Sequence, residues 1–573
     1  MNILGISFLS DASACVVQDG TLVSALGEER LNRVKLWNGI PRAAIRTALE
    51  LAGLRMDQID LIATHGAAPP APNPEPFHQK EEMILRSQLP PEKKQMQLEH
   101  LRSRLEHERM VLRIRTPAYL KEIQELAPGK PMITFGHHQA HAASAYYGSG
   151  WNECLVLTAD GWGEDGSSTL WRCSNGTMRF LRRSDSIDSL GYFYGSVTKA
   201  LGFIPHRHEG KVLGLAAHVQ NPKSFSKIRA MVDYDRTGKR FVSRMENGIY
   251  VPRFENPELK AFAQEFSRED ISASAQKTLE EVVCAFVADL GDFGGRFAVA
   301  GGIFANVKLN QRLCELPNVR ELFVFPNMGD GGLSAGAAWL AHVHKTGKRP
   351  EPLSTLYLGP GPTEKQLGSA VAASGFNYRH MPGRIEKEVA RLLAEGRIVA
   401  RFDDRMEFGP RALGNRSILC QATEPEINDW LNKRLQRSEF MPFAPATLAE
   451  DAAERYIGYE KARMPARHMT TTFECTSVMK AEAPAAVHID GTARPQVVSK
   501  QDNARFYTIL QEYKRLTGRA SLINTSFNMH EEPIVCTIND ALRAFQDSRL
   551  PYLAAGDFLV QFDPVPALAE SPR

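Results

Sequence analysis

The sequence lacks three features that would place it in a specialised class of protein. Its eight cysteines form no Cys-x-x-Cys pair, which disfavours a zinc ribbon and a disulfide framework and fits a reducing compartment. No segment stays apolar for about 18 residues, and the N-terminus enters a strand pattern without a secretion signal. The formal net charge over 573 residues is only +3, which gives no electrostatic argument for nucleic acid. We therefore expect a cytoplasmic protein that acts on a small molecule, with no nucleic-acid and no membrane partner.

Short apolar strands alternate with helices, which predicts an α/β fold with two large domains. The chain opens with strand patterns over 3–6, 14–17 and 21–25, joined as a hairpin. The same strand, turn and strand pattern recurs over 154–170, as a duplicated nucleotide-binding fold of the actin and hexokinase type would show. Proline and glycine are dense around 348–366 and break both helix and strand. We predict a linker there, between one domain over residues 1–347 and another over 367–573.

An insertion is predicted within the first domain. Residues 68–79 are rich in proline, and the segment that follows to about Arg115 is highly charged. This composition favours an inserted helical excursion with a solvated face over a specific binding role.

Two histidines lie four residues apart in the alanine-rich run 136–147. On a helix this spacing places His137 and His141 on one face, as two ligands of one metal. One apolar strand pattern ends at Asp160, and another is followed by Asp330, so these four side chains are predicted to converge on one ion. Such nitrogen and oxygen ligands suit iron, zinc or manganese better than calcium, and the sequence does not choose among them. The alternative is a helix N-terminus with exposed polar side chains.

Two further segments have the composition of nucleotide-binding loops. The loop 10–13 contains small polar residues that can bring backbone N–H groups and Asp11 close to a phosphate or its metal. An apolar strand over 297–300 leads to Gly301 and Gly302, where the backbone can approach a nucleotide closely.

Four short motifs of the second region join cations or hydroxyls to turn-forming residues, at 409–417, 442–445, 488–496 and 524–528. Arginine grips phosphate or carboxylate through two hydrogen bonds, while serine and asparagine complete the shell. The motifs together predict an anion-binding site. For Arg411 or Arg416 considered alone, the alternative is a surface arginine that forms an ion pair.

Together these motifs resemble the ATP-dependent O-carbamoyltransferase family, which includes nodulation, cephem and nebramycin-type carbamoyltransferases. The resemblance covers nearly the whole chain and rests on segments 11–14, 28–30, 137–147, 210–218, 300–302 and the four motifs of the second region. It implies an actin/hexokinase-like (ASKHA) N-terminal domain similar to the threonylcarbamoyl-adenosine transferase. It also implies a YrdC-like C-terminal domain that forms carbamoyl-AMP from carbamoyl phosphate and ATP. The carbamoyl group would then pass, along a closed path because water destroys the anhydride, to a hydroxyl of a natural product or sugar at the N-terminal metal site.

The resemblance also implies roles for individual residues. The metal ligands would be His137, His141, Asp160 and Asp330. Catalytic roles would fall to Asp11, Lys35, Arg411, Arg494 and Ser526. Nucleotide and carbamoyl phosphate would be bound by Lys211, Gly301, Gly302, Asn306, Arg416, His488, Asn524 and Asn528. The implied cofactors are ATP with Mg²⁺ and a divalent metal, with iron preferred over zinc or manganese; carbamoyl phosphate is the co-substrate, and a homodimer is the working assumption.

Two positions depart from the family pattern. Ser10 stands where the family often has histidine, and serine is too weakly basic to replace it unaided. The family often has lysine and arginine just before the motif that starts at Pro442, where this chain offers Arg437.

Two alternative functions stay open. A tRNA-directed threonylcarbamoyl transferase would need a basic tRNA surface, against which the weak net charge argues. A catalytically silent ATP-binding regulator would be favoured by loss of the metal ligands, but the ligands are present. Nothing in the sequence is diagnostic of the acceptor.

Overall fold

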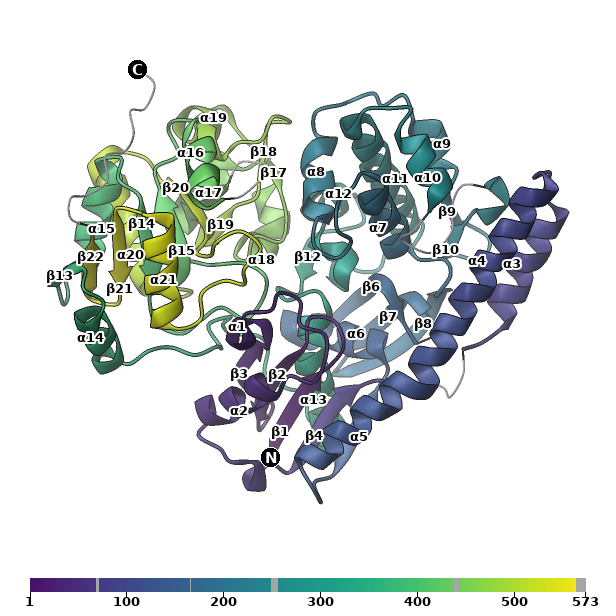
Figure 1. Cartoon of the computed structure of the whole chain (residues 1–573), viewed down its shortest axis with the longest axis horizontal. Helices are drawn as coiled ribbons and strands as arrows, with labels where there is room; N and C mark the ends of the chain where they lie inside the picture. Colours follow the sequence, from purple (N-terminus) through teal and green to yellow (C-terminus); the bar gives the residue numbers. More distant parts are fainter. Residues whose placement is uncertain (68–71, 165, 249–255, 437–442, 563–573) are drawn as a thin grey trace. The chain divides into compact units, whose positions relative to one another are not determined.

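The computed structural model describes residues 1–67, 72–164, 166–248, 256–436 and 443–562 (Figure 1). The chain divides into two compact units. The first comprises Met1–Leu9, Cys15–Leu22 and Arg55–Leu353; the second comprises Ser10–Ala14, Val23–Leu54 and Ser354–Arg573. Two pieces of N-terminal sequence therefore belong with the second unit, although a sequence boundary at 348–366 would leave them in the first domain.

Two five-stranded sheets share one strand order. The first runs β3 (Thr21–Gly27), β2 (Ser13–Gln18), β1 (Asn2–Ser7), β4 (Leu61–His65) and β5 (Met132–Phe135). The second runs β8 (Thr177–Asp185), β7 (Gly166–Ser174), β6 (Glu153–Gly163), β11 (Arg296–Ala300) and β12 (Glu321–Val324). In each sheet the earliest strand is central, the next two strands along the chain lie on one side, and two later strands add in parallel on the other. This repetition confirms the predicted duplicated topology of the actin and hexokinase type.

Helices α6 (His137–Ser149) and α13 (Leu333–Thr346) pack against each other and join the two sheets. Helix α6 packs on β6 and β11, while α13 packs on β1 and β4. The small residues of the sequence explain the close approach, because a Cβ atom at Gly336 would lie only 1.9 Å from the carbonyl oxygen of Ala140. The alanine-rich run is therefore buried on nearly every side, which holds both histidines of the run in a packed environment.

The predicted insertion consists of α3 (Glu75–Arg86), α4 (Pro91–Met110), a π-helical segment Val111–Arg115 and α5 (Thr116–Leu126). Helices α3 and α4 pack side by side (Figure 1). Their outer face is solvated as predicted, but an inner apolar cluster packs on Ile187 and Met245. Arg104 and Glu108 on that inner side are also buried, which the charged composition did not indicate.

The second unit contains an eight-stranded mixed sheet with helices packed on it. Its order is β13 (Asn377–His380), β22 (Phe558–Gln561), β21 (Tyr552–Ala555), β14 (Val399–Phe402), β15 (Arg416–Cys420), β20 (Ser521–Ser526), β16 (Ala444–Leu448) and β19 (Gln496–Val498). Helices α15 (Ile385–Ala394) and α20 (Ala504–Thr517) share an apolar core with these strands. The predicted α/β class is thus confirmed for both parts of the chain.

The other helices of eight or more residues are α2 (Arg42–Leu51), α7 (Leu190–Ala200), α8 (Glu209–Ala216), α11 (Arg268–Ala288), α12 (Val307–Glu315), α14 (Glu364–Ala373), α16 (Ile427–Arg434) and α21 (Ile538–Ser548). Shorter elements used below are α1 (Glu29–Asn32), β9 (Val232–Asp235), β10 (Arg240–Ser243) and β18 (Thr492–Ala493). Across the described ranges, no helix combines the length and the apolar character needed to cross a bilayer.

Candidate metal centre and anion-binding loops

The structure brings the four predicted metal ligands together. Nε2 of His141 lies 3.1 Å from Oδ2 of Asp160 and 3.5 Å from Oδ1 of Asp330. Nε2 of His137 lies 3.8 Å and 3.6 Å from the same two oxygens. Each of the four residues offers one ligand atom, and these four atoms all lie within 4.8 Å of one another. The four donors can therefore reach a single ion.

Sheet topology explains how two distant aspartates meet. Strands β6, β11 and β12 are parallel neighbours, so their carboxyl ends lie at one edge of the sheet. Asp160 lies near the end of β6 and Asp330 follows β12, with β11 between them. The intervening strand ends at Ala300 and is followed by Gly301 and Gly302. A side chain at Gly301 would collide with β6, because its Cβ would lie 2.2 Å from the Ala159 carbonyl oxygen. The paired glycines predicted to admit a nucleotide thus also make room for the metal ligand.

Backbone contacts fix the orientation of the ligands. The amide N–H of His137 donates to both carboxylate oxygens of Glu164, at 2.7 and 2.8 Å. Oδ1 of Asp160 accepts a hydrogen bond from the Gly161 amide at 2.7 Å, and the Asp160 carbonyl accepts one from the Ser189 hydroxyl at 3.2 Å. Such supporting contacts raise the affinity and define the geometry of metal sites.

The electrostatics of the cluster also fit a cation. Burial lowers the pKa of His137, but the neighbouring carboxylates of Asp160, Asp330 and Glu164 outweigh it and raise that pKa to about 9. Burial raises the pKa of Asp160, but the neighbouring imidazoles of His137 and His141, the latter within hydrogen-bond distance at 3.1 Å, hold that pKa well below the usual range. Among the described residues, the buried Nε2 of His137 has no hydrogen-bond partner. Two imidazole nitrogens and two carboxylates, already stabilised as a charged group, form a donor set suited to a borderline divalent metal.

Two further histidines surround the cluster without joining it. His138, next to the first ligand, bonds through Nδ1 to the Thr158 hydroxyl at 2.9 Å and through Nε2 to the Gly166 carbonyl at 3.1 Å. Burial lowers its pKa to about 3, so it is neutral. The ring of His65 lies 5.6 Å from that of His137, centroid to centroid, and burial lowers its pKa well below the usual value. The sequence gave no signal for His65, because only the strand order brings the end of β4 to this place.

Three other predicted site residues of the N-terminal part each lie in a defined local structure. Lys211 is buried on α8. Asn306 caps α12, since its Oδ1 accepts the Leu309 amide at 3.0 Å, and its amide group also bonds to Gln276. Asp11 lies in the turn between β1 and β2 with a φ of 51°, a left-handed conformation that is uncommon for aspartate and typical of functional loops.

In the second unit, Asn524 connects three of the predicted motifs. Its Nδ2 donates to Oε1 of Gln496 at 2.7 Å, and Nε2 of Gln496 donates to the Leu413 carbonyl at 2.8 Å. The loop that carries Arg411 and the turn that carries Arg494 are thereby tied to strand β20. Oδ1 of Asn524 is a buried acceptor with no hydrogen-bond partner among the described residues, so this junction can receive a ligand donor.

Glu407 organises the first anion-binding loop from within. Its Oε1 accepts the backbone amides of Leu413, Asn415 and Arg416 at 2.7, 2.9 and 3.2 Å. A carboxylate of the protein thus occupies the backbone donors that an external anion would otherwise use. The anion binding predicted for this loop would therefore fall to its side chains, including Arg411.

The side chain of Arg416 is held by contacts within the fold. It is completely buried, and its terminal nitrogens donate to the carbonyl oxygens of Asp403, Asp404 and Pro360. Its guanidinium carbon lies 4.0 Å from the centroid of the Phe402 ring, and burial lowers its pKa. The surface ion-pair alternative is therefore wrong for Arg416, and these contacts give it a fold-stabilising role.

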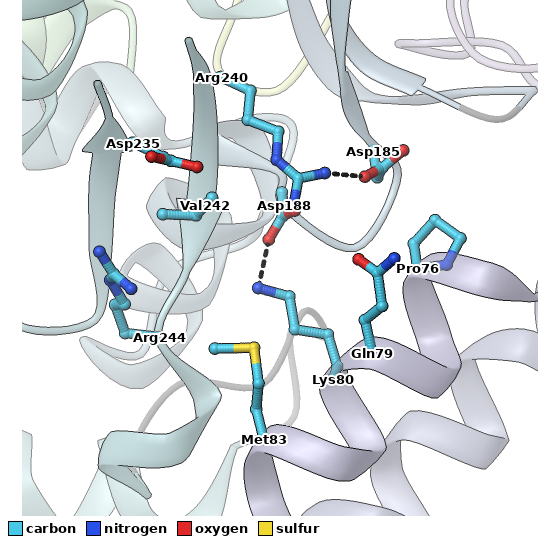
Figure 2. A pocket seen from close by; sticks show the side chains of 10 residues that line it. All are labelled: Pro76, Gln79, Lys80, Met83, Asp185, Asp188, Asp235, Arg240, Val242 and Arg244. Atoms are coloured by element: carbon cyan, nitrogen blue, oxygen red, sulfur yellow. Dashed lines mark hydrogen bonds and ion pairs between the residues drawn. The ribbon is translucent and has the colours of Figure 1, made fainter. Parts of the chain in front are cut away.

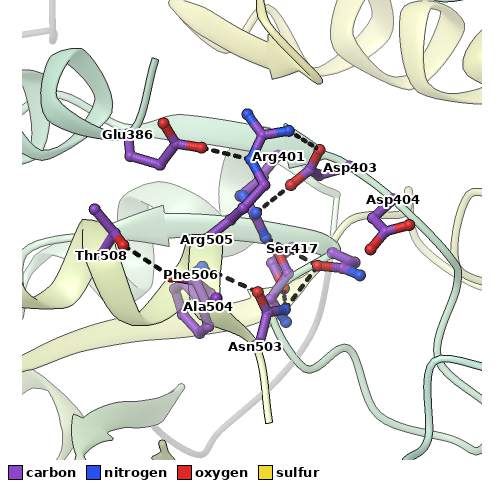
Figure 3. A network of polar contacts seen from close by, with 12 residues as sticks. Glu386, Arg401, Asp403, Asp404, Ser417, Asn503, Ala504, Arg505, Phe506 and Thr508 are labelled. Atoms are coloured by element: carbon purple, nitrogen blue, oxygen red, sulfur yellow. Dashed lines mark hydrogen bonds and ion pairs between the residues drawn. The ribbon is translucent and has the colours of Figure 1, made fainter. Parts of the chain in front are cut away.

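A polar network holds the end of the same loop (Figure 3). Arg505 donates to Asp403 at 3.0 Å, and Arg401 pairs with the other oxygen of Asp403. Oδ1 of Asn415 accepts from Arg401 at 3.0 Å and from Asn503 at 2.8 Å. The loop thus ends at Asn415, whose side-chain oxygen is held by Arg401 of β14 and by Asn503 in the turn before α20.

The remaining predicted residues of this unit lie near turns and strand ends. Ser526 ends β20, where it pairs in register with Ser417. The amide group of Asn528 donates to the Met529 and Glu532 carbonyls at 2.8 and 3.0 Å. Nδ1 of His488 lies 3.5 Å from Asp490 in the turn before β18. Arg437, the expected replacement for the family cations, and Pro442 lie outside the described residues.

The Glu-Glu-Arg motif fastens the N-terminal segment to the second unit. Glu28 accepts the Ala44 amide at 2.7 Å at the start of α2, and Glu29 accepts the Leu36 amide at 2.7 Å. Arg30 donates to the Gly409 carbonyl at 2.9 Å. The half-buried Lys35 therefore lies in a loop anchored on the motif that carries Arg411.

Comparison with known proteins places the chain in a family. The family model described as Carbamoyltransferase N-terminus matches residues 2–339, and the one described as Carbamoyltransferase C-terminus matches residues 390–561. The chain belongs to the carbamoyltransferase family. Among relatives of this carbamoyltransferase, nodulation protein NolNO of Sinorhizobium fredii is 30% identical over 97% of this chain and 79% of its own. Nodulation protein NolO of Bradyrhizobium diazoefficiens is 32% identical over 75% of this chain and 79% of its own.

A solved structure, full-length HypF in its phosphate- and nucleotide-bound form, covers 61% of this chain and 56% of its own, with 14% identity and a TM-score of 0.32. Family membership establishes the protein as an enzyme that transfers carbamoyl groups and favours that activity over the silent regulator.

Proposed function

We propose that this carbamoyltransferase forms carbamoyl-AMP with the anion-binding motifs of its second unit and transfers the carbamoyl group to a hydroxyl of a natural product or sugar at the His–Asp cluster. The observation that carries the proposal is the cluster itself, in which four ligand atoms lie within 4.8 Å of one another. Two carboxylates and two imidazoles at this spacing are costly to assemble unless they hold a cation.

The proposed reaction proceeds in two stages. Carbamoyl phosphate is first hydrolysed to carbamate and phosphate; a carbamate oxygen then attacks the α-phosphorus of ATP, and pyrophosphate leaves. In the second stage the acceptor oxygen attacks the carbamoyl carbon of the mixed anhydride, the bond from that carbon to the AMP oxygen breaks, and the hydroxyl proton is released. The mixed anhydride is needed because carbamate alone is a poor electrophile.

The second unit supplies groups suited to the first stage. Arg411 and Arg494 offer planar cations for phosphate and carbamate oxygens, and ATP would bring Mg²⁺. The buried Oδ1 of Asn524 can accept an N–H group of a ligand, with Ser526 two residues further along the same strand. Arg416 is not included, because its guanidinium is engaged by backbone carbonyls.

The first unit supplies the proposed metal ligands. When bound, a divalent metal acidifies the acceptor hydroxyl and offsets charge on the carbamoyl oxygen. His137 and His141 would bind through Nε2, and Asp160 and Asp330 through one oxygen each. We propose iron first, with zinc and manganese as the alternatives compatible with these donors. The small-molecule acceptor, the cytoplasmic location, the homodimer, and the lack of nucleic-acid and membrane partners stay predictions.

The test separates the two stages. Purified protein is incubated with ATP and carbamoyl phosphate, and carbamoyl-AMP and pyrophosphate are followed by mass spectrometry, while bound metal is counted by elemental analysis. Arg494→Ala should abolish carbamoyl-AMP and keep the metal, whereas His141→Ala should lose the metal and keep carbamoyl-AMP. The exposed His344→Ala is the matched control for the histidine and should change neither.

Two results would contradict the proposal. One is a His141→Ala protein that retains one equivalent of metal. The other is a wild-type protein that makes an adenylate only from threonine and bicarbonate, which would support the threonylcarbamoyl alternative instead.

A further inference from the structure

The helical insertion meets the turn between β8 and α7 through buried charges. Nζ of Lys80 on α3 lies 2.8 Å from Oδ1 of Asp188 (Figure 2). The same Nζ donates to the Ser243 carbonyl at 2.7 Å. A pocket of about 220 Å³ lies beside this pair, and Arg240 at its rim pairs with Asp185 at 2.7 Å. The charges of Lys80 and Arg240 are thus engaged by the turn, which indicates a structural joint between the insertion and the turn.

Helix α4 holds the same turn from a second point. Glu108 pairs with Arg104 at 2.8 Å, and its other oxygen accepts the Ser186 hydroxyl at 3.1 Å. Lys80, Arg104 and Glu108 are all nearly inaccessible to solvent. The turn over 185–189 is therefore clamped by both helices of the insertion.

The other side of this turn supports the metal ligand Asp160. The Ser189 hydroxyl donates to the Asp160 carbonyl at 3.2 Å. The backbone at Gly191 comes so close that a Cβ there would lie 2.8 Å from the carbonyl carbon of Asp160. A shift of the turn would consequently move the backbone that carries this ligand.

A second line of contacts leads from α4 to His137. The guanidinium carbon of Arg104 lies 5.1 Å from the centroid of the Trp162 ring. The Trp162 indole N–H donates to the Glu164 carbonyl at 2.7 Å, and the Glu164 carboxylate accepts the His137 amide. Arg104 thus reaches the first histidine through a stacked ring and a carboxylate.

We infer that the insertion α3–α4 positions the metal centre, with Arg104 and Lys80 as positioning residues that act through the 185–189 turn and through Trp162. This inference rests on the proposed metal site. Stability alone is a poor explanation for the two ion pairs, because burying paired charges often contributes nothing net relative to apolar side chains. Such directional contacts can instead hold metal ligands that are far apart in the sequence in their correct relative positions.

The test replaces a whole ion pair, so that no buried charge is left alone. In Arg104→Met/Glu108→Leu we expect a thermal midpoint close to that of the wild type, at least tenfold weaker Co²⁺ binding and a changed Co²⁺ absorption spectrum. Formation of carbamoyl-AMP from ATP and carbamoyl phosphate should keep its KM values. The matched control, Arg102→Met/Glu81→Leu, removes an exposed pair of 3.2 Å between the same two helices and should leave Co²⁺ binding unchanged.

A second variant covers the case in which the double replacement does not fold. Arg104→Lys keeps a cation beside Glu108 but loses the planar group over Trp162, and it should weaken Co²⁺ binding by a smaller factor. If a variant folds and binds Co²⁺ with the affinity and spectrum of the wild type, the positioning role is wrong, while the proposed metal site is not affected. A wild-type protein that binds no Co²⁺ would instead overturn the proposed metal site and the positioning role with it.

Discussion

Glu164 caps the helix that carries both histidines of the proposed metal site, by accepting the His137 amide with both carboxylate oxygens at 2.7 and 2.8 Å. The residue at the N-cap position, Gly136, offers no side chain for this purpose. A carboxylate at a helix N-terminus is favoured by the unpaired amides and the helix dipole there. The same carboxylate thus starts α6 and sets the position of its first ligand.

Removing the charge of Glu164 should weaken metal binding more than folding. In Glu164→Gln one hydrogen bond to the His137 amide can remain, but the second bond and the charge at the helix terminus are lost. We expect roughly tenfold weaker Co²⁺ binding, as is usual for residues that support metal ligands, measured by absorption titration. Glu153→Gln, at the exposed start of β6, is the control; equal affinities in the two variants would contradict this role.

Gly163 leaves room for the His137 ring. A Cβ at this position would lie 2.5 Å from Cδ2 of His137, so Gly163→Ala should displace the ring and reduce bound metal well below one equivalent. Gly210→Ala, whose Cβ meets nothing within 4 Å, is the matched control. Elemental analysis of both purified variants tests the prediction, which fails if Gly163→Ala holds a full equivalent.

Glu407 should be needed for the stability of the loop that it fills. Glu407→Ala leaves three backbone donors of a buried loop without their acceptor, and each such loss costs about 1–3 kcal/mol unless water replaces it. We expect a fall of about 3 kcal/mol in the free energy of unfolding, together with loss of carbamoyl-AMP formation. Urea denaturation of this variant and of the exposed Glu424→Ala measures the difference; similar midpoints would show that the loop does not depend on Glu407.

His468 should make the second unit sensitive to mild acid. Burial, followed by the charge of Arg467, lowers its pKa from 6.5 to about 3. Above pH 6.5 the ring is neutral in both states and has no effect. Below it, the unfolded chain takes up a proton that the folded protein refuses, so stability falls as the pH drops from 6.5 towards 3.

This contribution should amount to about 1–2 kcal/mol between pH 7 and pH 5. His468→Leu should lose that part of the pH dependence in urea denaturation at the two pH values, whereas the exposed His344→Leu should keep it. An unchanged pH dependence in His468→Leu would show that this ring does not limit acid stability.

Local sequence patterns predicted most of the elements that form the His–Asp cluster. The spacing of His137 and His141 placed them one helical turn apart, and apolar runs marked the strands that end near Asp160 and before Asp330. These predictions succeed because helix periodicity and strand ends are local properties of the chain. The motif around Arg411 likewise indicated a loop, whereas the motif over 524–528, predicted to lie at a turn, begins within strand β20.

Other features depended on residues far apart in the sequence. Arg416 resembled a phosphate ligand in its motif, yet carbonyls from two other segments surround its guanidinium. The charged composition of α4 indicated solvent, yet Arg104 and Glu108 pack against the turn after β8. Residues Val23–Leu54 begin within strand β3 of the first sheet but belong with the second unit. Composition cannot show which face of a charged helix is covered, because that depends on which elements pack against it.

The sequence by itself determined the α/β class, the duplicated strand pattern, the helix of the two histidines and the family motifs, since each depends on neighbours within a few positions along the chain. Only the tertiary structure decided that Asp160 and Asp330 meet these histidines within one small cluster, that Glu407 fills its own loop, and that Lys80 and Arg104 are buried where the insertion meets the turn after β8. These relationships connect strand ends, loops and an insertion that are separated by up to hundreds of residues. The distances between these parts are set by the order of the strands in the sheets and by the packing of helices on those sheets.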